Sequence, residues 1–396
     1  MKFRASSPSS WVYFFLSTVN ILISCLLALF VRSEPRVRIR VALFGHQFNG
    51  NLRVFFDRVG RFHPRLHCRF IYIDHNRYRR WCDDGTQSMS ALRIDHMFWV
   101  ARADVFMCDH GVSVFWLLKK LRPSIKFIDV WHGIGFKAIA KSTHFMFRDF
   151  SAILTSSNWV QKHSYITARY LAPERVYTTG YAITDPLVCD DADLDAIIER
   201  FRLDGQFRGR VLFAPTWQQD VKGRPIIPFG LEARDFFSRL NRWGQNKNVQ
   251  IVIRMHMNDV DAHHEMDYSH TVFRPMRAFP LTYELLLVTD VLITDWSSIA
   301  TDFLPLNRPI IFLDVSAPFT HGFLLTPDDR AGYIASDFNQ VEQYLQMAIG
   351  DPQHYRSKFS LLRARVIEKA YGDTLDGKCS ERYGEIIEKV IREGTS

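Results

Sequence analysis

The feature that most constrains the fold of this chain is a regular alternation of short apolar runs with amphipathic segments. The runs RIRVALFG (38–45), HCRFIYID (67–74), KFIDVWHG (126–133) and SAILTSS (151–157) are typical of buried strands. Segments with helical periodicity, such as LRVFFDRVGR (52–61), lie between them. Strands that alternate with helices predict parallel sheets of the doubly wound type.

This alternation occurs in two blocks. The acidic and helical segment CDDADLDAIIERFRLDG (189–205) interrupts it, and a second block begins with GRVLFAPTW (209–217). The second block continues through NVQIVIRMH (248–256) to RPIIFLDV (308–315). We therefore predict two Rossmann-like domains, over 38–190 and 205–375, with a linker at 191–204 and a C-terminal helix at 376–396.

A long apolar run follows a short N-terminal tail at 1–10. From Trp11 to Val31 there is no charged residue, and a run of this length predicts a membrane segment at 11–31. A cleaved signal peptide is the alternative, although the run is long for one and no small-residue cleavage site is evident. Four arginines follow the run between 32 and 40, whereas two basic residues precede it. This asymmetry favours an inner (cytoplasmic) membrane protein with its domains facing the cytoplasm.

The net charge of +8 favours an anionic partner. Eight arginines between 53 and 80 are mixed with phenylalanines, a combination found in nucleic-acid-binding proteins, but no known nucleic-acid motif accompanies them. Beside a membrane segment, an anionic membrane surface is the simpler partner, and no nucleic acid is expected. An ordinary solvated basic face is the alternative.

Polar and ionisable residues gather where the expected strands end. Ligands of open parallel sheets bind beyond the carboxyl ends of the strands, so we expect a cleft shared by the two domains. The residues at these ends include His132, Gly180, Thr216, Arg254, His256 and Asp295.

The stretch ITDWSSIATDF (293–303) carries the most information of these strand ends. Its apolar part stops at Asp295, and Ser297 or Ser298 then resembles a helix N-cap. Free backbone N–H groups and hydroxyls at a helix N-terminus suit a phosphate. A plain capped helix is the alternative.

Two histidines, His132 and His256, stand at strand ends, one in each half of the chain. A single histidine in a loop is more often structural, but one in each half favours a functional role, as a general base or as a donor to an anion. Gly133 lets the backbone approach a ligand, and Lys137 and Arg254 add positive charge. Such groups can stabilise phosphoryl transfer without a metal.

Other patterns carry less weight. His263-His264 lacks the H-E-x-x-H spacing of a zinc site, and GHQFNGN (45–51) lacks the G-K-[ST] ending of a phosphate-binding loop. We expect no metal and no organic cofactor.

Six motifs, in this order, resemble those of the CDP-glycerol glycerophosphotransferases, which include the teichoic acid primases and polymerases. The resemblance covers residues 100–390 in outline. The motifs are Trp131-His132-Gly133 with Lys137, Gly180-Tyr181 with Asp185, Ala214-Pro215-Thr216-Trp217, Arg254 with His256, Thr294-Asp295 with Ser297, Ser298 and Asp302, and Asp376-Gly377-Lys378.

The resemblance implies a GT-B fold at the cytoplasmic membrane face, with an acceptor-side N-terminal domain and a CDP-donor C-terminal domain. It implies transfer of glycerol phosphate from CDP-glycerol to a hydroxyl of a lipid-linked glycan acceptor, with release of CMP, in synthesis of a teichoic-acid-like or capsular polymer. His132 would activate the acceptor hydroxyl, and His256 would stabilise the leaving group. Donor-binding residues would be Thr216, Arg254, Thr294, Asp295, Ser297, Ser298 and Asp302, supported by Gly133, Lys137, Gly180 and Asp185.

The chain departs from the family pattern in several motifs. Ile134-Gly135 stands in place of Thr-Pro, Ala182 and Met257 each in place of Pro, Trp296 in place of Tyr, and Gln218 in place of Arg. Both histidines are kept, so we expect the same reaction, but ribitol or another polyol could replace glycerol in the donor. The alternatives are a GT-B glycosyltransferase with a nucleotide-sugar donor and a membrane adaptor without catalysis.

Overall fold

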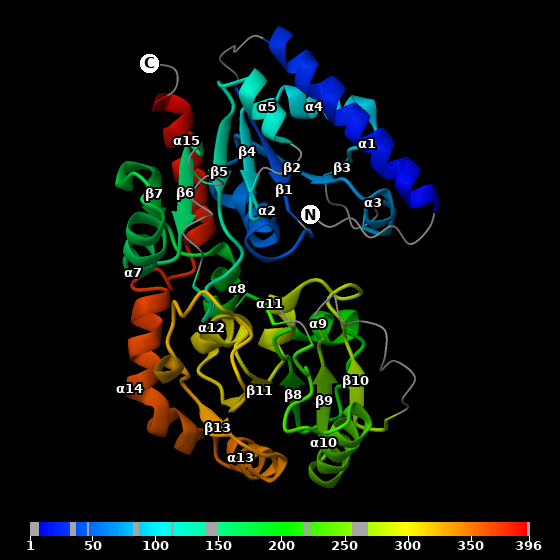
Figure 1. Cartoon of the computed structure of the whole chain (residues 1–396), viewed down its shortest axis with the longest axis vertical. Helices are drawn as coiled ribbons and strands as arrows, with labels where there is room; N and C mark the ends of the chain where they lie inside the picture. The colour runs from blue at the N-terminus through cyan, green and yellow to red at the C-terminus, as the bar shows by residue number, and fades with distance from the viewer. Residues whose placement is uncertain are drawn as a thin grey trace.

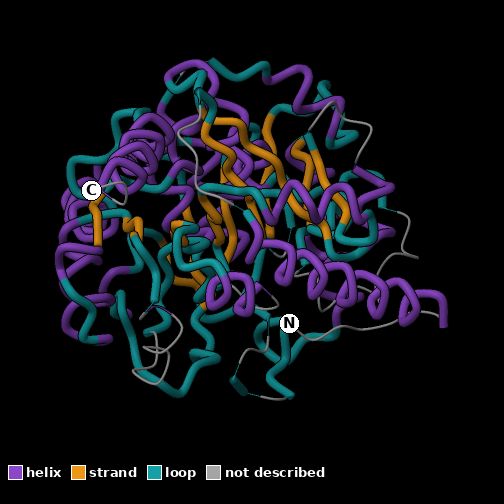
Figure 2. The backbone as a smooth tube through the Cα atoms, turned by 90° about the horizontal axis from the view of Figure 1, so that it is seen from above, coloured by secondary structure: helices purple, strands orange, loops and turns teal. Residues whose placement is uncertain are grey.

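The computed structural model describes residues 8–31, 37–45, 47–81, 87–111, 115–138, 147, 149–189, 191–217, 220–221, 223–255 and 268–393. Over these residues the chain forms two α/β units, one above the other in Figure 1, each built on a parallel sheet. Seen from above, the strands lie in the interior, with helices and loops around them (Figure 2). The prediction of two Rossmann-like halves is therefore confirmed.

The first unit contains a seven-stranded sheet in the order β3-β2-β1-β4-β5-β6-β7, with every neighbouring pair parallel. Its central strands are buried on both faces, which explains their continuous apolar sequences. The strands are β1 (Ile39–Phe44), β2 (Leu66–Tyr72), β3 (Ser88–Ser90), β4 (Val105–Cys108), β5 (Lys126–Asp129), β6 (Ala152–Thr155) and β7 (Val176–Thr178).

Helices cover both faces of this sheet. In α2 (Gly50–Phe62), Leu52, Phe55 and Val59 are buried at helical spacing, so the helix presents one apolar stripe to the sheet. The helical segment after β6 begins as α7 (Asn158–Val160) and continues with π-helical hydrogen bonding through Thr167. The other helices of this unit are α3 (His75–Trp81), α4 (Ile94–Ala101), α5 (Trp116–Leu121) and α8 (Asp185–Val188).

The second unit contains a six-stranded parallel sheet in the order β10-β9-β8-β11-β12-β13. Its strands are β8 (Gly209–Phe213), β9 (Val249–Ile253), β10 (Thr271–Phe273), β11 (Val291–Thr294), β12 (Ile310–Leu313) and β13 (Tyr333–Ala335). Its helices are α9 (Leu194–Arg200), α10 (Ala233–Lys247), α11 (Thr282–Leu287), α12 (Ile299–Phe303), α13 (Phe338–Gly350) and α14 (Pro352–Ala370).

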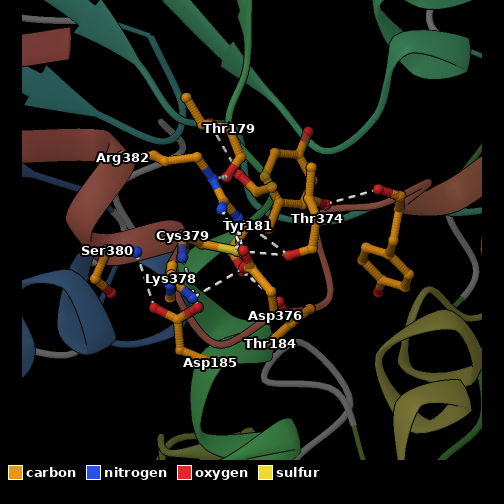
Figure 3. A network of polar contacts seen from close by, with 12 residues as sticks. Thr179, Tyr181, Thr184, Asp185, Thr374, Asp376, Lys378, Cys379, Ser380 and Arg382 are labelled. Atoms are coloured by element: carbon orange, nitrogen blue, oxygen red, sulfur yellow. Dashed lines mark hydrogen bonds and ion pairs between the residues drawn. The ribbon is translucent and has the colours of Figure 1, made fainter. Parts of the chain in front are cut away.

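The last helix, α15 (Cys379–Glu393), returns to the first unit and packs against α2 and β6 (Figure 1). Both carboxylate oxygens of Asp185 hold its N-terminus, accepting from the backbone N–H of Cys379 at 2.9 Å and of Ser380 at 2.8 Å (Figure 3). Gly180 has φ +79°, and a Cβ there would lie 2.4 Å from the Cys379 Sγ. Asp185 and Gly180 are therefore required for the seat of α15.

The expected apolar segment forms α1 (Pro8–Leu27), followed by a 3₁₀ turn (Ala28–Phe30). The helix lies along the outside of the first unit, against α4 and α5 (Figure 1). Within the described ranges it alone is long and apolar enough to cross a membrane, judged by length and composition. The two sheets fall inside 38–190 and 205–375, although the domain boundaries themselves stay a prediction.

Candidate active site

A cavity of about 620 Å³ lies between the two units. From the first unit it is lined by His132, Gly133 and Lys137, which follow the end of β5. From the second unit it is lined by Trp296 and Ser298, among others, at the end of β11. The cavity thus joins the carboxyl edges of both sheets, where parallel α/β folds bind ligands.

The segment after β5 crosses from the first unit to the second. The Thr301 Oγ1 donates to the Ile134 carbonyl at 2.5 Å, and the Leu324 N–H donates to the Phe136 carbonyl at 2.8 Å. The Lys137 Nζ lies 2.8 Å from the Asp220 Oδ1, and this contact holds the pKa of the Asp220 carboxyl below its usual range. These contacts fix one wall of the cavity to both units.

Glycines in this crossing segment let the backbone approach Ser298. Gly133 has φ +144°, and a Cβ there would lie 3.7 Å from the Ser298 Oγ. A Cβ on Gly135 would lie 3.4 Å from the Ser298 Cβ. The glycine turn therefore places the backbone beside His132 directly against the serine of the second unit.

The imidazole of His132 is exposed at the cavity and held from one side. Its Nδ1 lies 3.0 Å from the Asp109 carbonyl oxygen. A carbonyl only accepts, so this contact places the proton on Nδ1 and makes Nε2 the basic nitrogen of the neutral ring.

A second histidine lies against His132. The His110 ring stacks on the His132 ring with centroids 4.1 Å apart and planes 7° from parallel. The His110 Nδ1 lies 2.6 Å from the Asp109 Oδ1. Burial disfavours the imidazolium of His110, but the Asp109 carboxylate more than offsets this, and the pKa of His110 is raised.

The turn that presents His132 depends on a buried acid. Trp131 has φ +47°, a left-handed conformation that is rare for an aromatic residue. Its N–H donates to the Asp129 Oδ1 at 3.0 Å. Burial raises the pKa of the Asp129 carboxyl to about 7. Asp129 therefore anchors the strained turn between β5 and His132.

On the second unit, Asp295 organises the APTW loop. Its Oδ1 accepts from the Thr216 N–H at 2.7 Å, and its Oδ2 accepts from the Arg224 Nη2 at 2.6 Å. All three residues are buried, and the Thr294 Oγ1 donates to the Ala214 carbonyl at 2.7 Å. Both oxygens of Asp295 thus hold the protein itself, whereas the sequence predicted a direct contact with the donor.

Arg254 and Asp302 are likewise engaged inside the second unit. The Arg254 Nη1 donates to the Phe279 carbonyl at 2.9 Å, and its Nη2 donates to the Thr282 Oγ1 at 2.8 Å. Burial lowers the pKa of Arg254 to about 9 and raises that of Asp302 to about 7. In this arrangement neither residue lines the cavity, and both stabilise the interior of the second unit beside it.

The residues expected at the site fall into four groups. The first group lines the cavity and consists of His132, Gly133, Lys137 and Ser298. Next to it, the Ser297 Oγ accepts from the Ile299 N–H at 3.5 Å. A second group is buried inside the second unit: Thr216, Arg254, Thr294, Asp295 and Asp302. Gly180 and Asp185 hold α15. His256 lies outside the described residues, as do Met257 and Gln218.

Sequence reasoning missed the partners of His132. Asp109 and His110 follow β4, the neighbour of β5 in the sheet. The strand-end rule that selected His132 would have selected them too, had it been applied to VFMCDHG. Trp217, Tyr165 and His321 also line the cavity without having been expected there as site residues.

Two facing parallel-sheet units with a cavity between their carboxyl edges define a GT-B-like protein. The solved structure of the wall teichoic acid polymerase TagF matches with a TM-score of 0.73 and 16% identity, covering 99% of this chain and 100% of that one. The structure of S. aureus MnaA with UDP matches with a TM-score of 0.56 and 12% identity, covering 90% and 97%. At these identities the likeness shows the fold.

The sequence comparison gives the family. The model of the CDP-glycerol:poly(glycerophosphate) glycerophosphotransferases matches residues 28–389, so the chain belongs to this family of transferases. A teichoic acid poly(ribitol-phosphate) polymerase of Bacillus spizizenii is 26% identical over 315 residues, 74% of this chain and 47% of the relative. A teichoic acid poly(glycerol phosphate) polymerase of Staphylococcus epidermidis is 25% identical over 387 residues, 91% and 51%. The chain spans about half the length of the curated relatives it matches.

Proposed function

We propose that this chain transfers glycerol phosphate, or a related polyol phosphate, from a CDP-polyol to a hydroxyl of a membrane-associated acceptor and releases CMP. The observation that carries this proposal is the position of His132, whose ring lines the interdomain cavity while the adjoining glycines pack on Ser298. A base from one unit and a hydroxyl from the other thus meet at one cavity. The family match supports the reaction type.

In the proposed reaction the Nε2 of His132 takes the proton of the acceptor hydroxyl. The acceptor oxygen attacks the phosphorus that carries the polyol and forms a phosphodiester bond. The bond from that phosphorus to the bridging oxygen breaks, and its electron pair leaves with CMP. His132 has the tautomer for this role because its Nδ1 faces the Asp109 carbonyl.

We assign phosphate binding to the serine end of β11. Ser297 and Ser298 offer hydroxyls beside the cavity, and Lys137, which contacts the Asp220 carboxylate, lies on the opposite wall. A donor phosphate would compete with Asp220 for the charge of this lysine. The Thr216 Oγ1 is buried and has no hydrogen-bond partner among the described residues, so a donor phosphate would reach it only if the loop after β8 moved. Arg254, Thr294, Asp295 and Asp302 would preserve the shape of this wall. The role of His256 at the leaving group rests on the family resemblance.

The identity of the alcohol in the donor rests on the relatives of this chain. One relative is a ribitol-phosphate polymerase and others are glycerol-phosphate polymerases, so both CDP-polyols are candidates. A TagF structure was obtained with CDPG, which favours glycerol. A glycosyltransferase with a nucleotide-sugar donor is the second candidate, because the fold is shared with MnaA, whose structure holds UDP.

We further propose that the acceptor is a lipid-linked glycan and that the product is a teichoic-acid-like or capsular polymer. The protein would work at the cytoplasmic membrane, on an anionic lipid surface. The apolar helix α1 and the teichoic acid polymerases among the relatives support this location.

The test is nucleotide release by the purified chain with a membrane extract as acceptor. CDP-glycerol, CDP-ribitol and common nucleotide sugars are compared, for the parent chain, for His132→Ala and for the control His354→Ala, an exposed histidine on α14. CMP release from a CDP-polyol that His132→Ala abolishes and His354→Ala retains would support the proposal. Release of a nucleoside diphosphate from a sugar donor would replace it with the glycosyltransferase.

A further inference from the structure

Along α1 and the 3₁₀ turn after it, the buried side chains are mostly small or polar, and most of the large apolar side chains are exposed. The buried positions recur at helical spacing, and they are Ser17, Ile21, Ser24 and Cys25 on α1 and Ala28 in the 3₁₀ turn. A surface helix of a water-soluble protein has the opposite arrangement, with the apolar stripe inside. The outer face of α1 is therefore suited to an apolar environment.

The inner face of α1 is bonded to the first unit. The Asn20 Nδ2 donates to the Ala91 carbonyl at 3.2 Å and to the Leu92 carbonyl at 2.7 Å. The Ser17 Oγ donates to the Ile73 carbonyl at 3.3 Å. These carbonyls follow β2 and β3, so the polar residues within the apolar run satisfy backbone groups at one edge of the sheet.

The outer face of α1 forms a continuous apolar stripe. Trp11, Phe15, Leu22 and Leu26 on α1 lie 45–66% exposed along it, and Leu29 in the 3₁₀ turn continues it at 53%. Phe98 on α4 and Trp116 on α5 are 46% and 55% exposed, and both helices pack against α1. Figure 1 shows these helices together at the outer edge of the first unit. Exposed apolar surface of this extent marks an interaction site.

A basic residue lies beside this stripe on α5, and further basic residues flank the apolar run along the sequence. The Lys120 Nζ lies 5.8 Å from the centre of the exposed Trp116 ring. Along the sequence, Lys2 and Arg4 precede α1, and four arginines follow it between 32 and 40, whereas no charge falls between Trp11 and Val31. An apolar face with basic flanks complements a bilayer with anionic headgroups.

We propose that α1 lies in the plane of the membrane as an integral helix of the first unit, with Trp11, Phe15, Leu22, Leu26 and Leu29 inserted among anionic lipids. A spanning orientation would remove Asn20 and Ser17 from their carbonyl partners and place them in hydrocarbon, where polar groups are costly. Cleavage after the run would uncover the apolar surfaces of α4 and α5 and the same carbonyls. The inference defines how the proposed membrane location is achieved, and it does not depend on the donor.

The first test is flotation of the purified full-length chain with vesicles, in the absence of substrate. The parent chain is expected to float with mixed phosphatidylglycerol and phosphatidylcholine vesicles, and less with phosphatidylcholine alone or in high salt. The combined variant Phe15→Ser, Leu22→Ser, Leu26→Ser is expected to lose at least roughly 100-fold in vesicle affinity. The control Leu361→Ser, at a residue 86% exposed on α14, is expected to float as the parent does.

The second test measures depth. Nitroxide labels are placed on Phe15→Cys, Leu22→Cys and Leu26→Cys, with the labelled parent chain as background for the native cysteines. A helix in the membrane plane gives similar depths at all three positions. A spanning helix separates Phe15 from Leu26 by about 16 Å, at about 1.5 Å per residue, and that result would overturn the proposal.

The third test uses the inner face. Asn20→Leu makes α1 more apolar, which would favour a spanning helix, but it removes two bonds to the first unit. A lower melting temperature with unchanged flotation is expected, whereas unchanged stability with a spanning depth profile contradicts the inference.

One other result would assign the stripe to a second copy of the chain. That result is absent vesicle binding together with a dimer in solution that the triple serine variant dissociates. Normal flotation without any CMP release would leave this inference intact and count only against the proposed reaction.

Discussion

The imidazole rings of His110 and His132 lie face to face, with centroids 4.1 Å apart, and Asp109 contacts both of them. The Asp109 carboxylate favours the charged form of His110, and its carbonyl oxygen faces the Nδ1 of His132. A positive charge stacked on a base makes that base harder to protonate, so we expect His110 to keep His132 neutral at lower pH.

This relationship predicts a change in the pH dependence of CMP release. His110→Phe keeps an aromatic ring against His132 but removes the charge, so the acidic limb of the pH–rate profile should move to higher pH. Asp109→Asn removes the partner that holds the His110 proton, but it also removes a negative charge close to His132. These two effects oppose each other, so the limb should move less than in His110→Phe. A rate that falls equally at every pH, with the limb unmoved, would mean that His110 has only a packing role.

Replacement of the proposed base should separate activity from folding. His132→Ala is expected to lower the rate by roughly 100- to 10,000-fold, the usual contribution of a positioned general base. Its ring is exposed, so the unfolding transition should change little. Nucleotide release and thermal melting of the same preparation give both values, with His354→Ala as the surface control. A variant with parental activity would exclude His132 as the base.

The buried pair of Asp295 and Arg224 should behave as a unit. Removing either partner leaves a buried charge without its counterion, which costs about 3–5 kcal/mol of unfolding free energy. Denaturant titration of Asp295→Ala, of Arg224→Ala and of the double variant measures the coupling. We expect the double variant to lose clearly less than the sum of the two single variants. Additive losses would show that the two side chains act independently.

Gly180 and Gly230 form a matched pair of positive-φ glycines. Both have left-handed backbone, at φ +79° and φ +68°, but a Cβ on Gly180 meets the Cys379 Sγ at 2.4 Å whereas one on Gly230 meets nothing within 4 Å. Alanine at either position has the same backbone cost, about 1 kcal/mol. Gly180→Ala should lose at least about 1–3 kcal/mol more, because α15 must shift. Equal losses by denaturant unfolding would contradict the close seat of α15.

Buried acids should make stability fall as the pH rises. Burial raises the pKa of Asp302 to about 7, so between its unfolded value of 3.8 and about 7 the folded chain binds more protons than the unfolded chain. This group therefore contributes its whole stabilisation to the free energy of unfolding at acidic pH, and the contribution is lost as the pH rises toward about 7. Asp302→Asn should reduce the difference between unfolding free energies measured at about pH 5 and about pH 8. An unchanged difference would locate the dependence elsewhere, with Asp129, whose pKa is raised in the same way, as the next residue to test.

The sequence predicts the fold well because fully buried parallel strands leave continuous apolar runs such as VLIT and VQIVI. The same strand-end rule placed His132 and Ser298 at the cavity. It could not predict the structural roles of Asp295 and Arg254, because tertiary packing determines their hydrogen-bond partners. Arg224 lies 71 residues from Asp295 along the chain, and Arg254 bonds to backbone carbonyls that no residue type reveals.

The N-terminal run illustrates the same limit. Its composition identifies an apolar helix, but composition does not predict which face of the helix packs against the rest of the protein. Ser17 and Asn20 look like flaws in a membrane span, whereas in the structure they are the residues that dock α1. Short edge elements were also missed, including β3 and β10, each three residues long and too brief for a periodic signal.

The return of α15 to the first unit has a mechanical consequence. The chain leaves the first unit after α8 and returns to it at α15. The second unit is therefore an insertion in the first, connected to it by two backbone segments. Asp185 lies in α8, just before the chain passes into the second unit. Its carboxylate accepts hydrogen bonds from the first residues of α15, where the chain has returned, and it therefore joins the two connections. The segment after β5 adds a third attachment, because Thr301 and Leu324 of the second unit donate to its carbonyls. The two units are therefore held together both where the chain passes between them and at the wall of the cavity.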